Sequence, residues 1–300
     1  MHRSFRLVGW SAALAAASLY AHEWQPHAGG RLAPLTPVAG AKAVGFTRLP
    51  AAELGINFTN RLADERSLTN RNLLSGSGVA CGDVDGDGRC DLFFTGLDSP
   101  NQLFRNLGNW NFTNVTAAAF PASPGGTAAK PAPNDSTGAA FADVDGDGDL
   151  DLLVNGLHAG TRLFLNDGQG RFNEVTDAAG LRSGSGATSL ALADVEGDGD
   201  LDLYVCNFRP DTILDQPAAK FTVRQVGNRP VVISMNGRPV TEPDLTNRFE
   251  VGAGGNVIEF GEADVLWLND GRGHFTAAKW SATFSDEAGQ PVPGADRDWG

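Results

Sequence analysis

The chain has 300 residues, of which 41% are hydrophobic and 38 are glycine, and it shows few long helical patterns. That composition allows a buried core and is typical of a turn-rich β protein. The formal net charge of −13 disfavours a phosphate backbone as a ligand, so we expect no nucleic-acid partner.

The first 21 residues are typical of an export signal. Arg3 and Arg6 precede an apolar run at 7–19, and small residues lead to a cleavage site after Ala21. The run is 13 residues long, shorter than the ~20 needed to span a bilayer. A buried first helix is the alternative. Because no later apolar run is long enough for a membrane anchor, we expect a secreted protein, extracellular or periplasmic.

Residues 22–45 are rich in Pro, Gly and Ala and are interpreted as a linker. From 46 to 300, comparison of the chain with itself reveals a repeat. Three segments align without a gap: GVACGDVDGDGRCDLFF at Gly78–Phe94, GAAFADVDGDGDLDLLV at Gly138–Val154 and SLALADVEGDGDLDLYV at Ser189–Val205.

Each of these segments is followed by a β-hairpin pattern, in which an apolar stretch leads to Asn, a Gly-containing turn and an aromatic residue. The three hairpins are LFRNLGNWNF at Leu103–Phe112, LFLNDGQGRF at Leu163–Phe172 and LWLNDGRGHF at Leu266–Phe275. A unit of four short antiparallel strands in roughly 50 residues describes one propeller blade. The sequence therefore predicts an all-β fold of the β-propeller type, with blades near 78–116, 138–176 and 189–276.

The third repeat is longer than the other two because of an expected β insertion at 209–263, at the rim of that blade. Within it we expect strands at Phe221–Val226 and Val231–Met235, joined by Gly227–Pro230. Since propellers typically have 4–8 blades, three cannot close a ring. Residues 282–300 are similar to the approach to a further blade, so we expect these blades to belong to a longer polypeptide. The alternative is a short chain that assembles with copies of itself.

An acidic loop lies between the first two strands of each predicted blade. Its positions 1, 3, 5 and 9 carry carboxylates and its positions 4 and 6 are always glycine, which permits the positive φ angles of a tight coil. Calcium takes 6–8 oxygen ligands, and four carboxylates this close repel one another without a cation. The predicted metal ligands are Asp83, Asp85, Asp87 and Asp91, then Asp143, Asp145, Asp147 and Asp151, then Asp194, Glu196, Asp198 and Asp202, with the backbone carbonyls of Arg89, Asp149 and Asp200.

These loops are not EF-hands, because position 12 is Phe94, Val154 or Val205 instead of a bidentate Glu. A ligand set of hard oxygens without His or Cys disfavours zinc and copper. An Asp-Gly turn that binds no ion is the alternative. We expect about three calcium ions, the weakest in the third loop, where Glu196 adds a methylene.

The motif D-x-D-G-D-G-x-x-D-L, at Asp83–Leu92 and Asp143–Leu152 and with Glu at position 3 in Asp194–Leu203, resembles the FG-GAP/VCBS repeat family, which includes the integrin α-subunit propellers. The hairpins and the segment GINFTN at Gly55–Asn60 are also similar. Within that family the chain is most similar to exported bacterial proteins that resemble cartilage acidic protein, although it shows no ASPIC/UnbV segment. The resemblance implies calcium in these loops and a role in adhesion or recognition.

The chain has three cysteines, and export would allow disulfides. Cys81 and Cys90 flank the first acidic loop, where we expect the two strands to be adjacent, and they are candidates for a bridge. The alternative is a pair of reduced cysteines, since Phe141 and Leu150 occupy the same places in the second repeat.

No HExxH, GxSxG or P-loop motif occurs, and the five histidines are scattered, so we expect no catalytic residues and no enzyme. Trp110, Trp267 and Trp280 are expected to pack between blades. The preferred function is a calcium-stiffened module that recognises an unidentified protein or glycan. A calcium-dependent polysaccharide-active enzyme and a structural part of a larger surface protein remain alternatives, and an enzyme should show Lys, Arg, His or Tyr converging on one face.

Overall fold

The computed structural model describes residues 25–27, 30–32, 48–121, 135–278 and 290, in two units, Met1–Arg48 and Leu49–Gly300. In the first unit, strands β1 (Gln25–His27) and β2 (Gly30–Leu32) form an antiparallel pair. The predicted signal peptide lies outside the described residues, as does the expected start of a further blade, apart from Gln290. Trp280 lies outside them too.

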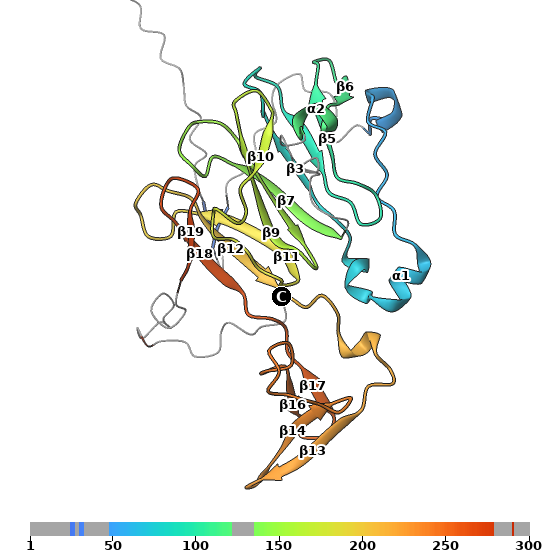
Figure 1. Cartoon of the computed structure of the whole chain (residues 1–300). Helices are drawn as coiled ribbons and strands as arrows, with labels where there is room; N and C mark the ends of the chain where they lie inside the picture. The colour runs from blue at the N-terminus through green and yellow to red at the C-terminus, as the bar shows by residue number, and fades with distance from the viewer. Residues whose placement is uncertain (1–24, 28–29, 33–47, 122–134, 279–289, 291–300) are drawn as a thin grey trace, which may run out of the picture. The chain divides into compact units, whose positions relative to one another are not determined.

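The second unit contains three four-stranded antiparallel sheets, each a meander in the predicted strand order (Figure 1). In each sheet the acidic loop joins the first two strands and the Asn-Gly turn joins the last two. The described residues form no closed ring. The strands are β3 (Val79–Gly82), β4 (Asp91–Phe94), β5 (Gln102–Asn106) and β6 (Phe112–Asn114), then β7 (Ser136–Ala142), β8 (Asp151–Gly156), β9 (Gly160–Asn166) and β10 (Phe172–Glu174), then β11 (Ala187–Ala193), β12 (Asp202–Asn207), β18 (Val265–Asn269) and β19 (Phe275–Ala277).

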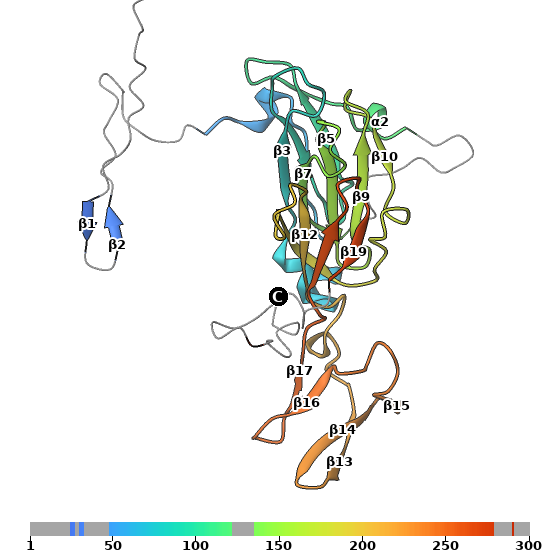
Figure 2. The same ribbon diagram turned by 90° about the vertical axis from the view of Figure 1, so that its left-hand side faces the viewer.

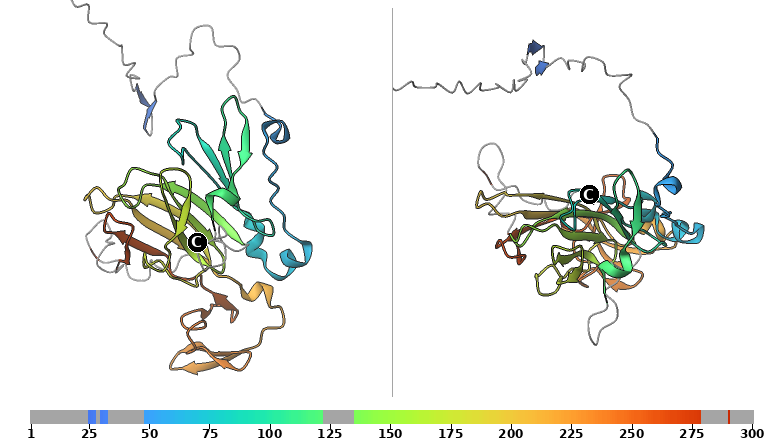
Figure 3. Two further views of the ribbon diagram at one scale, coloured as in Figure 1. Left: turned by 45° about the horizontal axis from the view of Figure 1, so that its top comes forward. Right: turned by 90° about the horizontal axis from the view of Figure 1, so that it is seen from above.

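The three sheets lie side by side as blades, and Figure 3 shows them from two further directions. Their first strands β3, β7 and β11 are neighbours, and Gly78 allows the closest approach. A Cβ atom on Gly78 would lie 2.9 Å from the Cα of Gly138, so any side chain there would push the blades apart.

The core consists of two apolar layers, one between each pair of neighbouring blades. The first layer joins Phe93 and Leu103 to Leu152 and Phe164, and the second joins Leu153 and Leu163 to Leu203, Val205 and Phe275. Most of these side chains are fully buried. Because each layer needs side chains from two blades, the blades stabilise one another.

Short helical segments flank the blades, although the sequence showed no helical periodicity beyond the predicted signal peptide. They have three to six residues, too few to produce a periodic pattern. In the segment before β3, Phe58 stacks on Phe94 with 5.0 Å between ring centroids. The helices are α1 (Asp64–Thr69) and α2 (Thr116–Ala119), and the 3-10 turns are η1 (Ala51–Leu54), η2 (Arg71–Ser75) and η3 (Ile213–Asp215).

The predicted insertion lies between β12 and β18 and forms two small sheets that project from the third blade (Figures 1 and 2). The predicted turn Gly227–Pro230 is too long, because Val226 pairs with Arg229 and leaves a two-residue turn that places Pro230 in a strand. Gly227 supplies the positive φ of 62° that this turn requires. The strands are β13 (Phe221–Val226), β14 (Arg229–Met235) and β15 (Arg238–Pro239) in one sheet, and β16 (Phe249–Val251) and β17 (Val257–Glu259) in the other.

Candidate metal sites

The ninth residue of each acidic loop is a buried aspartate that ties the loop to the hairpin of its own blade. In the second blade, Asp151 accepts hydrogen bonds from the backbone N–H of Val144 at 3.0 Å and of Asn166 at 2.9 Å. Asp91 and Asp202 accept the equivalent pair. Each carboxylate oxygen receives one N–H and keeps a second lone pair, so the carboxylate is fixed and still able to bind a cation.

The first aspartate of each loop fixes the coil of the backbone. Asp143 accepts hydrogen bonds from the N–H groups of Gly146 at 2.8 Å and Gly148 at 3.0 Å. These two glycines have φ angles of 77° and 93°, as expected from the sequence. A residue with a Cβ atom would strain this coil, which explains why positions 4 and 6 are glycine in all three loops.

Two of the three loops gather their carboxylates into a cluster that could hold a metal ion. Asp83, Asp85 and Asp91 form one cluster. Asp143, Asp145 and Asp151 form the other. In both, one carboxylate oxygen from each residue lies within 4.8 Å of those of the other two. Among the described residues, the third loop does not form such a cluster.

The pKa values of three carboxylates in the first two loops are raised, mainly because these groups are buried. Burial raises the pKa of Asp151 to about 6, although its two backbone hydrogen bonds act in the opposite direction. Burial also raises the pKa of Asp91 and, together with the charge of Asp147, that of Asp145. A cation at the cluster would lower these pKa values again, because it stabilises the ionised form.

Each formed loop is covered by the hairpin of the next blade. The side-chain amide of Asn166 donates to the carbonyl of Val84 in the first blade at 2.8 Å, and to Leu150 in its own blade at 3.1 Å. In the third blade, the side-chain amide of Asn269 makes the equivalent two hydrogen bonds. It donates to the carbonyl of Val144 in the second blade at 2.8 Å and to that of Leu201 in its own blade at 3.1 Å. These asparagines were not among the predicted site residues, although their recurrence at the same place in the three hairpins was visible in the sequence.

The third loop lacks this cover within the described part of the chain. The exposure of the second residue of each loop shows the difference in cover. Val84 is 4% exposed and Val144 is 1% exposed, whereas Val195 is 50% exposed. Glu196 is exposed as well. The position of the third loop, at the outer face of the third blade, explains why its carboxylates are not drawn together like those of the other two.

Replacing Asn166 by alanine should lower the free energy of unfolding by about 2 kcal/mol, because the buried carbonyl of Val84 and the partly buried carbonyl of Leu150 each lose a side-chain donor. Asn106→Ala is the matched control, since Asn106 donates only to Cys90 in its own blade and is less buried. Urea unfolding in the presence of a chelator measures both variants. Equal losses for the two would contradict a cross-blade role for Asn166.

The first cluster contains a competing cation of its own. The guanidinium of Arg105 pairs with Asp85, whose side chain is only 4% exposed. The second and third blades have Leu165 and Leu268 at the place of Arg105. Arg105 also borders a cavity of about 160 Å³, which leaves room for its side chain to move away from the cluster.

The remaining predicted ligands lie at the exposed side of the loops. Asp87 and Asp147 accept hydrogen bonds from the backbone two residues ahead and stay outside the two clusters. Asp198 does the same in the third loop. Arg89, Asp149 and Asp200 were expected to bind the ion through their backbone carbonyls. The side chain of Arg89 forms an ion pair with Asp87 at 2.6 Å. The side chains of Asp149 and Asp200 lie against Gly168 and Gly271 of their own hairpins.

The structure corrects two expectations about side chains near the first blade. Cys81 and Cys90 are exposed free thiols, so the expected bridge is not formed. Cys81 faces Leu92 across the strands, which places Cys90 at the diagonal position instead of directly opposite. Trp267 packs between blades as expected, but Trp110 is 66% exposed, because no blade within the described residues lies against its hairpin.

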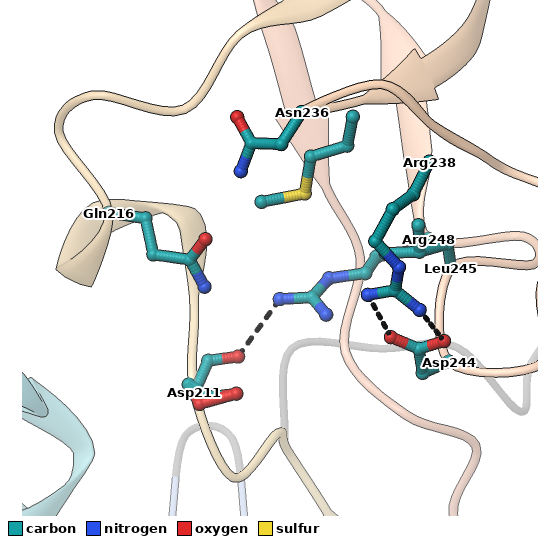
Figure 4. A pocket seen from close by; sticks show the side chains of 8 residues that line it. Asp211, Gln216, Asn236, Arg238, Asp244, Leu245 and Arg248 are labelled. Carbon is teal, nitrogen blue, oxygen red and sulfur yellow. Dashed lines mark hydrogen bonds and ion pairs between the residues drawn. The ribbon is translucent and has the colours of Figure 1, made fainter.

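The base of the insertion holds a small polar cavity of about 120 Å³ (Figure 4). Arg248 donates to the carbonyl of Asp211 at 3.0 Å and pairs with Glu259 at 2.6 Å. Arg238 is held by Asp244. Since each of these arginines already has a carboxylate partner, the cavity offers hydrogen-bonding groups and little net charge. The amides of Gln216 and Asn236 also border it.

Blades of four strands with an acidic loop between the first two define a repeat protein of the β-propeller type. Residues 83–154 and 143–205 match the model of the FG-GAP-like repeat. The family match spans both formed clusters and the whole third loop.

The chain is similar to cartilage acidic protein 1 of Mus musculus, with 25% identity over 189 residues, covering 62% of this chain and 27% of the relative. The chain is also similar to cartilage acidic protein 1 of Xenopus tropicalis, with 26% identity over 217 residues. That match covers 70% of this chain and 28% of the relative. The chain thus spans little more than a quarter of these relatives. A solved lectin structure from Agrocybe aegerita, titled for recognition of non-reducing terminal N-acetylglucosamine, shares 22% identity with a TM-score of 0.26, covering 68% of this chain and 52% of that one.

None of the helices in the described ranges is long and apolar enough to cross a membrane.

Proposed function

We propose that this chain is an extracellular, calcium-binding FG-GAP module that recognises a protein or glycan and has no catalytic activity. The observation that carries the proposal is the pair of carboxylate clusters at the same loop position in successive blades. Their ligand atoms are all hard oxygens, which calcium prefers and zinc and copper do not. Extracellular location is supported by the similarity to cartilage acidic protein 1 and by the predicted export signal.

The proposed ligands are the carboxylates at positions 1, 3, 5 and 9 of each loop and the carbonyl at position 7. In the second loop, Asp143, Asp145 and Asp151 are already in place, and Asp147 needs only to turn inward. Calcium would offset the burial and the repulsion from Asp147 that raise the pKa of Asp145. The third loop should bind last, because its carboxylates must first be drawn together.

Recognition is assigned to the insertion at 209–263, which projects from the third blade and carries the polar cavity (Figure 4). Asparagine, glutamine and aspartate side chains around a small hollow provide the donors and acceptors that sugar hydroxyls or a peptide backbone require. The blades would hold this element rigidly, which favours binding because less conformational entropy is lost.

Isothermal titration with calcium tests the metal part of the proposal, and a glycan array with an extracellular-protein screen tests recognition. The calcium part fails if the chain takes up no calcium. Turnover of uronic-acid polymers would favour the polysaccharide-active alternative. Absence of any ligand in both screens would favour a purely structural role.

Replacing Arg105 by leucine, the residue found in the other two blades, should strengthen calcium binding at the first site about tenfold. The guanidinium repels the ion and occupies Asp85, and its partial exposure limits the size of the effect. Titration in an Asp151→Ala background, which removes the second site, isolates the first of the two formed sites. The reverse change, Leu165→Arg, should weaken the second site. An unchanged first-site affinity in Arg105→Leu would argue against competition by this side chain.

A further inference from the structure

Strand β13 is the free edge of the three-stranded sheet in the insertion. The strand order of that sheet is β13-β14-β15, so β13 pairs on one side only within the described residues (Figures 1 and 2). Five of its six residues are exposed, whereas each strand of the three blades contains at least one buried residue. Alternate residues of an edge strand direct their backbone N–H and C=O groups away from the sheet, where these groups can bond to another extended chain.

The edge is held in place by the rest of the insertion. Phe221 of β13 meets Phe249 of β16 edge to face, with 5.1 Å between ring centroids, and β14 pairs with β13 along its length. The register shifts between Thr222 and Val223, and a bulge of this kind bends the strand. The regular part of the edge is therefore Val223–Val226. Because this part is already extended and paired, little conformational entropy is lost when another strand is added.

This sheet is basic in a chain that is acidic overall. Residues 216–241 contain no Asp or Glu, although the whole chain has a formal net charge of −13. Lys220, Arg224 and Arg229 are exposed, and their side chains form no ion pair with another described residue. Arg238, by contrast, is already bound by Asp244. An acidic ligand can therefore bind the three free cations without displacing a carboxylate of this chain.

One face of the hairpin formed by β13 and β14 combines two of these cations with exposed apolar side chains. Arg224 lies opposite Val231, and Val226 lies opposite Arg229. Since the two pairs are two residues apart along each strand, all four side chains are on the same face. Val226 is 59% exposed and Val231 is 40% exposed. A strand added to β13 would place its own side chains beside Arg224 and Val226, which favours a carboxylate at the first place and an apolar residue at the second.

From the free edge, the unpaired cations and the exposed valines we infer that β13 binds an extended, acidic segment of a partner protein, which joins the sheet as an added strand. Backbone hydrogen bonds along Val223–Val226 hold the segment, and its carboxylates pair with Arg224 and Arg229. The same cations repel a second copy of this edge, which disfavours pairing of this chain with itself.

The proposed function assigns recognition to the insertion, and the partner named here rests on that assignment. An acidic glycan matches the cations of the sheet, but it lacks the regularly spaced N–H and C=O groups with which a strand edge pairs. The free edge therefore favours a peptide over a glycan as the ligand of β13.

Fluorescence anisotropy of the whole chain with a labelled synthetic peptide of alternating Glu and Val, about ten residues long, tests binding at this edge. The unmodified chain should bind the peptide, and added sodium chloride should weaken the binding. Arg224→Glu should raise the dissociation constant at least about tenfold, because it replaces an attraction by a repulsion. Arg171→Glu is the matched control, since Arg171 is exposed on the hairpin of the second blade, and it should leave the constant unchanged. Melting temperatures verify that both variants fold.

Two further probes test whether the peptide is added as a strand. The same peptide with its central backbone nitrogens methylated keeps its charges but cannot pair with an edge, so its dissociation constant should be at least about tenfold higher. The unmethylated peptide should slow amide hydrogen exchange in 221–226. Polygalacturonate, which carries carboxylates without a peptide backbone, should leave that exchange unchanged.

An unmodified chain that does not bind the peptide would overturn the inference. So would equal binding of the methylated peptide, or an Arg224→Glu variant that binds as well as the unmodified chain. The proposed function would survive these results if the protein and glycan screens find a ligand that Arg224→Glu still binds. If those screens find no ligand either, both the recognition function and the role of β13 are wrong.

Discussion

Replacing Asp151 by alanine is expected to lower the free energy of unfolding by about 2–4 kcal/mol even without metal, and to remove calcium binding at the second site. The carboxylate is fully buried and is the partner of two backbone N–H groups, from Val144 and Asn166. Leaving two buried donors unsatisfied costs about 1–3 kcal/mol each. Relief of burying a charge, visible in the raised pKa of Asp151, offsets part of that cost.

Asp147→Ala is the matched control for this experiment. Asp147 belongs to the same loop but is exposed and accepts its backbone hydrogen bond only from Asp149. It should weaken calcium binding while changing the metal-free stability by less than about 0.5 kcal/mol. Urea unfolding in chelator and calcium titration separate the two effects. Equal metal-free stabilities for the two variants would show that Asp151 is a ligand only.

Calcium itself should stabilise the protein by about 5 kcal/mol at a concentration 100 times the dissociation constant. Each formed site contributes about 2.7 kcal/mol under that condition, because calcium binds the folded loop and hardly the unfolded chain. Two loops are formed, and affinities of about 10⁻⁴–10⁻³ M are typical of extracellular modules. The third loop should add less, since its carboxylates must be gathered first.

The measurement is urea unfolding with and without calcium, with sodium chloride used to match ionic strength. Magnesium at the same concentration should stabilise the fold much less, because it demands octahedral geometry at 2.0–2.1 Å and dehydrates reluctantly. A midpoint that calcium leaves unmoved, together with no heat of binding, would refute calcium sites in these loops. Equal stabilisation by magnesium would indicate general charge screening instead of specific coordination.

The repeat and its local chemistry could be read from the sequence because their determinants lie close together in the chain. Nine residues contain the alternating carboxylates and the two glycines of each loop, and the structure shows the positive φ angles that these glycines were expected to supply. The strand order of each blade followed from the hairpin turns for the same reason. Two strands of the insertion, β13 and β14, were predicted to within two residues, whereas β15, β16 and β17 were not predicted.

Only the tertiary structure decided which of the three similar loops are formed. The hydrogen bonds that cover them join Asn166 to Val84 and Asn269 to Val144, across 82 and 125 residues of chain. The third loop has nearly the same residues but no blade beyond it in the described chain, so its carboxylates stay apart. Local spacing sets what a loop can bind, whereas contacts between distant blades determine whether its ligands are held together, because only packing repays the entropy of ordering them.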